Sequence, residues 1–289
     1  MNTAAEALLA EAQAVLTGAT PGRPAVQGDV RVGVDLGTAK MVLLALDDQG
    51  QPLAGRLWPA QVVRDGLVVD FIGAVDRLRQ MKAEVEAELQ RTLTAAVSGY
   101  PPGVPEPERQ AIAHVVQSAG MDCLELIDEP SAANNVLGIR QGAIVDVGGG
   151  TTGIAVVERG EIVYTADEAT GGTHFNLVIA GALDISYEDA ERLKETPGEQ
   201  SRLLGMVRPV MEKIGTIIAR HLAGRSVDQI HLVGGACAFP GIDEVVAELT
   251  GLPATLAAHT QLVTPLGLAL GRPLAANPSL LEAVSNWSR

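Results

Sequence analysis

The sequence predicts an α/β fold made of two similar halves with a cleft between them. Strand-like and helix-like stretches alternate along most of the 289 residues. A strand, a turn containing glycine and threonine, two further strands and then helices occur near residue 31 and again near residue 143. Such an internal repeat constrains the fold more strongly than any single motif, because each copy must bury its own apolar faces.

The elements of each half follow from apolar periodicity and from breaks at glycine and proline. The first half predicts strands at 31–36, 41–46, 52–58, 93–97 and 124–127, with helices at 71–91, 107–119 and 131–137. The second half predicts strands at 143–147, 154–157, 161–166 and 229–233, with helices at 174–183, 187–194, 201–223 and 241–249. The stretch Ser98–Gly103 is expected to break the chain after a strand.

Composition narrows the class of protein. The chain is 47% hydrophobic but only 3% aromatic, so aliphatic side chains and alanine must build its core. The length suits one large domain or two of ordinary size. A formal net charge of −14 argues against nucleic acid and anionic membranes as partners, because both carry phosphate.

The cellular setting is predicted from cysteines and from the N-terminus. Two cysteines, Cys123 and Cys237, are too few for a disulfide scaffold and favour a reducing cytosol. The first residues include Glu6 and Glu11 and lack the basic segment of a signal peptide. No apolar run approaches the ~20 residues of a membrane span. The sequence therefore predicts a soluble cytoplasmic protein.

The N-terminal segment, residues 1–28, is predicted as a separate element. Apolar residues recur at helical spacing over 2–16, which predicts an amphipathic helix. Glycines and prolines at 17–28 predict a linker. Two interpretations of the helix stay open: packing on the parent domain, or docking to a partner.

Two turns of similar composition each follow a buried strand, one in each half. The first spans Asp35–Lys40 and the second Asp146–Gly153. Glycines let a backbone approach phosphate closely, and the amides of such turns form an anion-binding concavity. One such turn is a weak indication, since aspartate and glycine are ordinary turn residues, but a pair is far more specific. The candidate phosphate-binding residues are Gly37, Thr38, Ala39, Lys40, Gly148, Gly149, Gly150, Thr151 and Thr152.

The two aspartates of these turns, Asp35 and Asp146, would repel phosphate. Mg²⁺ prefers carboxylates and phosphate oxygens as ligands. The sequence therefore predicts that both aspartates hold Mg²⁺, directly or through water.

A third glycine motif follows the predicted strand at 229–233. Gly234 and Gly235, with Ala236, would let a base or ribose lie against the backbone. The alternative is an ordinary strand-to-helix loop. Cys237 beside them is expected to fill space, because no base that would activate a thiolate is evident.

Glu129 stands where a predicted strand meets a helix of small residues. One interpretation makes its carboxylate the group that orients or activates a water attacking a γ-phosphate. The other makes it the cap of the helix. Pro130 suits a first helical position.

Glu191 and Lys194 share a face of the predicted helix at 187–194. They form a surface ion pair or contact a nucleoside, and Gly172 lies in a Gly-Gly-Thr-His turn before them. His174 of that turn is expected to be structural. The sequence contains no His/Cys metal spacing, no G-x-x-x-x-G-K-[ST] loop and no G-x-S-x-G turn.

Taken in order, these motifs resemble the ATPase superfamily of actin, DnaK-type chaperones and sugar kinases. The matched segments are two phosphate loops, an adenosine motif and two connecting helices: Asp35–Thr38, Asp146–Thr151, Val233–Ala236, Glu129–Ala133 and Thr264–Ala269. The resemblance covers about residues 30–272 and implies duplicated ribonuclease-H-like halves around a cleft for ATP and Mg²⁺. Lobe I would comprise 29–140 with 265–289, and lobe II 141–264.

Within that superfamily, three stretches resemble a family of ethanolamine-utilisation accessory proteins: Val62–Gly66, Asp70–Val75 and Asp167–Gly172. That resemblance implies a cytosolic, chaperone-like protein whose partner is a bacterial microcompartment enzyme or shell protein. The superfamily resemblance gives catalytic roles to Glu129, Asp146 and Asp35, and places Gly172, Glu191, Lys194, Gly234, Gly235 and Ala236 at the nucleotide.

The chain departs from DnaK-type chaperones in three places. Only residues 195–200 stand where they insert an extra subdomain, and 58–93 is too short for the subdomain that supplies their catalytic lysine. No peptide-binding domain follows residue 272. No residue clearly replaces that lysine, although Lys40 lies in the first phosphate loop and could reach phosphate. We therefore expect an open cleft with slow or absent ATP hydrolysis.

Three functions fit these observations. The first is a nucleotide-driven switch or chaperone-like factor serving a microcompartment. The second is a small-molecule kinase. The sequence argues against it, because it shows no second polar cluster that could bind an alcohol substrate. The third is a non-hydrolysing scaffold like the filament-forming and cell-division relatives of actin. The sequence leaves a homo-oligomer open.

Overall fold

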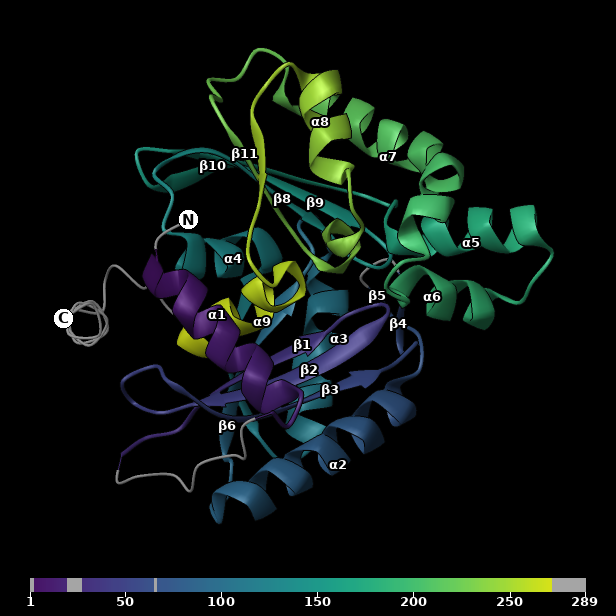
Figure 1. Ribbon diagram of the computed structural model, residues 1–289. Helices are drawn as coiled ribbons and strands as arrows, with labels where there is room; N and C mark the ends of the chain where they lie inside the picture. The colour runs from purple at the N-terminus through teal and green to yellow at the C-terminus, as the bar shows by residue number, and fades with distance from the viewer. Residues whose placement is uncertain (1–2, 20–27, 65–66, 272–289) are drawn as a thin grey trace. The chain divides into compact units, whose positions relative to one another are not determined.

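The computed structural model describes residues 3–19, 28–64 and 67–271 (Figure 1). The chain divides into two compact units, Met1–Ile139 with Leu262–Arg289, and Arg140–Gln261.

The first unit contains a five-stranded sheet in the order β3-β2-β1-β6-β7. Strands β1, β2 and β3 pair antiparallel, whereas β6 and β7 continue the sheet in parallel with β1. The strand bounds are β1 (Arg31–Leu36), β2 (Lys40–Leu46), β3 (Pro52–Pro59), β6 (Ala95–Tyr100) and β7 (Asp122–Asp128). A separate hairpin, β4 (Val63–Arg64) with β5 (Leu67–Val68), was not predicted, and 65–66 between them lie outside the described residues.

Helices cover both faces of this sheet. Helices α2 (Phe71–Leu89) and α3 (Glu106–Ser118) share an apolar core with Val32, Val34 and Leu36 of β1. Helices α1 (Thr3–Leu16), α4 (Glu129–Leu137) and α9 (Val263–Leu270) cover the other face, where Gly33 meets the backbone of Ala269. Because side chains alternate along a strand, Asp35 shares the face of Gly33.

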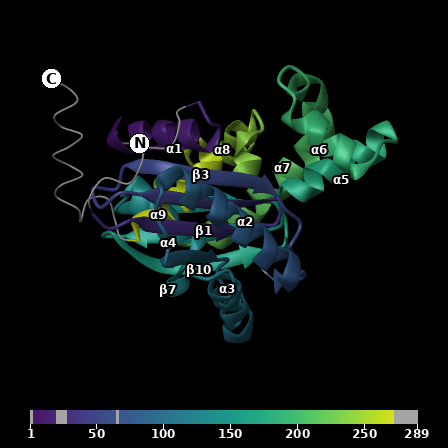
Figure 2. The same cartoon turned by 90° about the horizontal axis from the view of Figure 1, so that it is seen from below.

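Helix α1 runs along strand β3 (Figure 2). Leu16 Cδ2 lies 2.8 Å from where a Cβ at Gly55 would stand, so this glycine admits the helix. The buried residues of α1 are Ala4, Ala5, Leu8, Leu9, Ala12 and Val15. The interpretation that this helix packs on its own domain is confirmed. Because its apolar face is buried there, that face is not available to bind a partner. The predicted linker falls largely on 20–27, outside the described residues.

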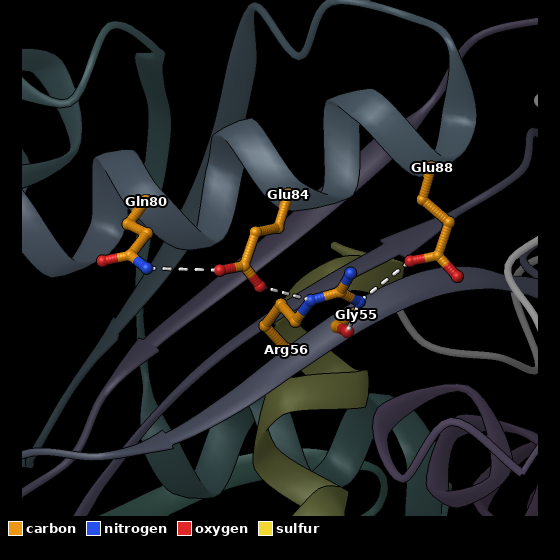
Figure 3. A network of polar contacts seen from close by, with 5 residues as sticks. All are labelled: Gly55, Arg56, Gln80, Glu84 and Glu88. Atoms are coloured by element: carbon orange, nitrogen blue, oxygen red, sulfur yellow. Dashed lines mark hydrogen bonds and ion pairs between the residues drawn. The ribbon is translucent and has the colours of Figure 1, made fainter.

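A charged network ties α2 to strand β3 (Figure 3). Arg56 donates from Nε to Glu84 at 2.8 Å and from Nη1 to Glu88 at 2.9 Å. The two glutamates are one helical turn apart, so both reach the same guanidinium. All three side chains are partly exposed, so each ion pair contributes at most about 1 kcal/mol to stability.

Helices α4 and α9 cross at a glycine. A Cβ at Gly267 would overlap the carbonyl oxygen of Ala132, so only glycine allows this approach. Asn135 donates from Nδ2 to the carbonyl oxygen of Gly267 at 3.1 Å. The segments matched to connecting helices are thus helical, and α4 packs on α9.

Strand β6 corrects one prediction, because it runs through Ser98 and Gly99 where a break was expected. Ser98 is fully buried, and its hydroxyl donates to the carbonyl of Val34 at 2.8 Å. Leu268 Cδ1 lies 3.1 Å from where a Cβ at Gly99 would stand. Packing partners distant in sequence therefore explain residues that locally resemble a turn.

The second unit repeats the sheet, in the order β10-β9-β8-β11-β12. Strands β8, β9 and β10 are antiparallel, and β11 and β12 are parallel to β8. Their bounds are β8 (Gln141–Val147), β9 (Thr152–Glu158), β10 (Glu161–Glu168), β11 (Ile230–Val233) and β12 (Ala254–Leu256). Strand β12 was not predicted. The identical strand order confirms the predicted α/β fold with a repeated design.

Helices α5 (Gly172–Leu183), α6 (Tyr187–Glu195), α7 (Gln200–Leu222) and α8 (Ile242–Thr250) pack together in this unit (Figure 1). Short helices η1 (Gly235–Ala238) and η2 (Thr260–Leu262) add to them. Ala143, Val145 and Val147 of β8 face the core that α7 shares. Because residues alternate along the strand, Asp146 lies on the opposite face.

Candidate functional site

The turn Gly148–Thr151, here called the second glycine loop, joins β8 to β9. The amide of Gly148 closes the loop by donating to the carbonyl of Thr151 at 2.9 Å. Among the described residues, no hydrogen bond uses the amides of Gly149, Gly150 or Thr151. Successive amides at a turn form a concavity that suits an anion.

The start of α5 braces this loop. The amide of Gly172 donates to the carbonyl of Gly148 at 2.9 Å, and that of Thr173 donates to the carbonyl of Gly149 at 2.8 Å. A Cβ at Gly171 would stand 2.6 Å from the oxygen of Gly148. The backbone of Gly171 is extended, so glycine is needed here for close approach and not for an unusual φ.

The connection into α5 is also tied to β9. Thr152 is fully buried and donates its hydroxyl to the carbonyl of Thr170 at 2.8 Å. The hydroxyl that the sequence offered to phosphate is therefore used inside the protein. Thr151 is the other threonine of the motif and is mostly buried at the loop.

Asp146 and Gly234 meet at the carboxyl ends of parallel strands β8 and β11, where Asp146 pairs with Val233. Gly234 has a φ of +93°, which disfavours other residues. A Cβ there would overlap the Asp146 carboxylate and lie 2.5 Å from the carbonyl oxygen of Val147. Ligands of α/β sheets bind at this end of the strands.

The third glycine motif and helix α6 reach the same place. The Cβ of Ala236 lies 3.4 Å, and Nζ of Lys194 3.7 Å, from where a Cβ at Gly172 would stand. A Cβ at Gly235 would meet no heavy atom within 4 Å, so its backbone borders open space. Glu191 shares α6 with Lys194 and is half-buried. The predicted motifs of the second unit thus converge around Gly172.

Cys237 is confirmed as a buried space-filling residue, with 1% of its surface exposed. Burial, and secondarily the Asp146 carboxylate nearby, raise the pKa of its thiol well above the ordinary value. A neutral thiol is a poor nucleophile and a poor metal ligand. Cys123 is also a free thiol.

The first unit builds its glycine loop with the same closure. The amide of Gly37 donates to the carbonyl of Lys40 at 3.1 Å, and Leu36 pairs with Met41 as Val147 pairs with Thr152 in the second unit. The amide of Ala60 donates to the carbonyl of Ala39 at 3.0 Å, which ties the loop to the chain after β3. Thr38 is half-buried within this loop.

Glu129 begins α4 but does not cap it. The cap is Asp128, whose carboxylate accepts from the amide of Ser131 at 3.1 Å and from its hydroxyl at 2.6 Å. The capping interpretation of Glu129 is therefore wrong, and Pro130 is the second helical residue. Glu129 Cγ lies 3.7 Å from where a Cβ at Gly99 would stand, beside the end of β1 that carries Asp35.

Mg²⁺ is the metal that this donor set fits. The described residues contain no group of three or more His, Cys, Asp or Glu side chains that could hold a metal. Mg²⁺ is commonly held by one or two carboxylates together with phosphate oxygens and water. Each glycine loop has one aspartate beside it, Asp35 in the first unit and Asp146 in the second, and one such carboxylate meets that requirement.

The sequence missed the residues that brace the second glycine loop, above all Gly171 and Thr170. The available signal was the glycine pair Gly171-Gly172 directly before a helix, since such a pair permits close backbone contact.

A hollow of about 330 Å³ lies elsewhere, between α3 and β7 of the first unit. Arg109, Cys123 and Glu125 are among its lining residues, and none of the predicted site residues is. Its mixture of acidic and basic groups does not suit a polyphosphate. None of the described helices has the length and apolar character to cross a membrane.

Comparisons with known proteins place the fold of this chain within a class. The family described as MreB/Mbl protein matches residues 55–195, and that described as cell division protein FtsA matches 143–285. The structure of MreB5 of Spiroplasma citri bound to AMPPNP has a TM-score of 0.70 at 18% identity, covering 90% of this chain and 99% of that one. The repeated sheets with these likenesses define an actin-like ATPase fold, which confirms the predicted fold class.

The relatives narrow the class to one family. Ethanolamine utilization protein EutJ of Escherichia coli K12 is 40% identical over 257 residues, 89% of this chain and 90% of that protein. The crystal structure of EutJ from Carboxydothermus hydrogenoformans is 41% identical with a TM-score of 0.87, covering 93% of this chain and 99% of that one. The chain belongs to the EutJ family, which confirms the resemblance to ethanolamine-utilisation proteins.

Proposed function

We propose that this chain binds ATP with Mg²⁺ and acts as a nucleotide-dependent, chaperone-like accessory protein of a bacterial microcompartment. The main observation in support of this proposal is that the second glycine loop, the start of α5 and Gly234 converge beside the Asp146 carboxylate. The EutJ family supplies the ethanolamine-utilisation setting. The solved relative with the same fold bound to AMPPNP supports the class of ligand.

The amides of Gly149, Gly150 and Thr151 would bind phosphate oxygens, and Lys194 would add positive charge close by. Asp35 and Asp146 would hold Mg²⁺. The open backbone at Gly235 and Ala236 would receive the nucleoside, with Glu191 near it. In the first unit, Gly37, Thr38, Ala39 and Lys40 would form the second phosphate contact.

Bound ATP would supply a transferable γ-phosphate. Glu129 would orient a water and accept its proton, and Lys40 of the first glycine loop would supply positive charge. The chain would act as two lobes whose closure on nucleotide biases partner binding. Lobe I would comprise residues 29–140 with 265–289, and lobe II residues 141–264. The partner would be a microcompartment enzyme or shell protein.

Titration calorimetry of ATP·Mg²⁺ into the full chain tests the binding. Asp146→Asn keeps the shape of the side chain but removes its charge, so we expect micromolar affinity in the natural chain and at least tenfold weaker binding in the variant. Asp76→Asn, on the exposed face of α2, is the matched control and should bind normally. Equal affinity in all three proteins, or no binding to any, would overturn the proposal.

The partner role needs a separate measurement. Affinity capture of microcompartment enzymes and shell proteins should depend on ATP, and the dependence should vanish in Asp146→Asn. A partner set that ignores both nucleotide and the substitution would reject the switch.

A second candidate, a nucleotide-dependent scaffold, is favoured by the MreB/Mbl and FtsA likenesses. It predicts assembly with ATP that sedimentation would detect. Particles of unchanged size with and without ATP would count against it.

A further inference from the structure

A chain of connected polar side chains lies in the second unit, outside the glycine loop. The hydroxyl of Tyr164 and Nδ1 of His221 are 2.7 Å apart, and Nε2 of His221 is 2.9 Å from the Glu168 carboxylate. Tyr164 and Glu168 are four residues apart on β10, so they share one face of the strand. His221, near the end of α7, bridges them.

Two arginines hold the ends of this chain. Arg220 forms an ion pair with the Glu168 carboxylate. Arg225 lies with Cζ 3.3 Å from the ring centroid of Tyr164, and its Nε donates to the carbonyl of His221 at 2.8 Å. The hydrogen bond from His221, followed by the charge of Arg220, keeps the pKa of Glu168 below its ordinary value against the opposing effect of burial. The carboxylate is therefore ionised and accepts at neutral pH.

This network of side chains contacts the end of strand β10. Among the described strands β10 pairs only with β9, at the edge of its sheet, and edge strands fray more readily than central ones. Glu168 is its last residue and pairs with Thr152. The amide of Thr170 donates to the carbonyl of Glu168 at 2.7 Å, and Gly172 follows two residues later. The end of β10 is thus only a few residues along the sequence from the amides that brace the second glycine loop.

We propose that Tyr164, His221 and Glu168 form a positioning relay through which α7 holds the end of β10, and thereby the 169–172 connection, against the second glycine loop. These side chains act through Gly172 and Thr173 and contact no nucleotide themselves. The consequence for nucleotide affinity rests on the proposed ATP site, whereas the positioning does not.

Amide hydrogen exchange of the full chain without nucleotide tests the positioning. In His221→Phe we expect about fivefold faster exchange at Gly172 and Thr173, the effect of losing about one hydrogen bond. Exchange at Val145, in the central strand β8, should change much less than at Gly172 and Thr173. Glu168→Gln keeps an acceptor oxygen and should fall between the natural chain and Glu168→Ala. Arg208→Gln, elsewhere on α7, removes the ion pairs of Arg208 with Glu212 and Glu248 and is the control.

A double variant distinguishes a relay from independent contacts. If His221 acts through Glu168, adding His221→Phe to Glu168→Ala should cause little further change. Calorimetry should show ATP·Mg²⁺ affinity falling by about the same fivefold factor in each single variant.

The outcomes separate the two proposals. Unchanged exchange with intact ATP binding would overturn the relay and leave the nucleotide site standing. An equal acceleration of exchange at Val145 would also overturn it, because the role would then be general stability. Local exchange changes in a protein that binds no ATP would support the relay and reject the nucleotide proposal.

Discussion

Each unit contains a hairpin of the same kind around its glycine loop, but different contacts hold the two hairpins in place. In the first, the residue after the loop is Met41, which is fully buried in the apolar core. In the second, the matching residue is Thr152, equally buried, whose hydroxyl bonds to the carbonyl of Thr170. Equal strand order and equal loop closure therefore do not produce equal loops, because the neighbours that brace each loop differ.

Close-approach glycines show the same contrast. In the first unit, Gly33 and Gly267 bring helix backbones onto the sheet and onto each other. In the second, Gly171 and Gly234 bring backbone against the glycine loop and against Asp146. The first unit uses glycine to pack helices, whereas the second also uses it to form the candidate site.

Gly267→Ala should have the largest effect and break the first unit. The new Cβ would overlap the Ala132 carbonyl, and neither helix can yield without losing its packing, so we expect a loss of about 4 kcal/mol in unfolding free energy. Urea denaturation would measure it. Gly205→Ala, at a helical glycine with open space around it, should be neutral or stabilise by up to about 1 kcal/mol. Similar stabilities for the two variants would contradict the packing argument.

Gly234→Ala is the corresponding test in the second unit. Positive φ and the overlap with Asp146 together should cost about 3 kcal/mol. Gly235→Ala, one residue on and facing open space, is the matched control and should leave stability nearly unchanged. The argument fails if thermal unfolding does not distinguish the neighbours.

Thr152→Val sharpens the comparison of loop bracing. The substitution keeps the shape but leaves the buried carbonyl of Thr170 without its donor, so we expect a loss of about 1–2 kcal/mol. Hydrogen exchange at Gly172 should accelerate as well. Met41→Leu, at the matching position of the first unit, conserves apolar volume and should cost less than about 1.5 kcal/mol. A variant as stable as the natural chain would show that the hydroxyl does not brace the loop.

The smallest expected effect is that of pH on Glu168, in the second unit alone. The folded-state pKa of Glu168 is lowered from 4.5, first by the hydrogen bond from His221. Its contribution to stability is therefore present above the unfolded value and is lost as pH falls through the lower, folded value. The stability difference between the natural chain and Glu168→Gln should shrink between about pH 7 and about pH 3. If this stability difference does not change across the pH range, the ionised Glu168 carboxylate does not stabilise the fold as described.

The sequence by itself determined the elements and the loops. Apolar periodicity located α2 and α7 to within about two residues, and glycine and threonine chemistry located both phosphate-type turns. These features are local, because a helix face or a tight turn is specified by residues close together in the chain. Even the repeated design could be read from the order of such segments.

The tertiary structure decided what each residue does within those elements. It placed Ser98 inside a strand, made Asp128 and not Glu129 the cap of α4, and joined His221 to Glu168, 53 positions away. It also set Gly171 against Gly148 and Gly234 against Asp146. The physical reason is that hydrogen bonds and close backbone contacts depend on partners that only folding brings within reach, and no local pattern encodes them.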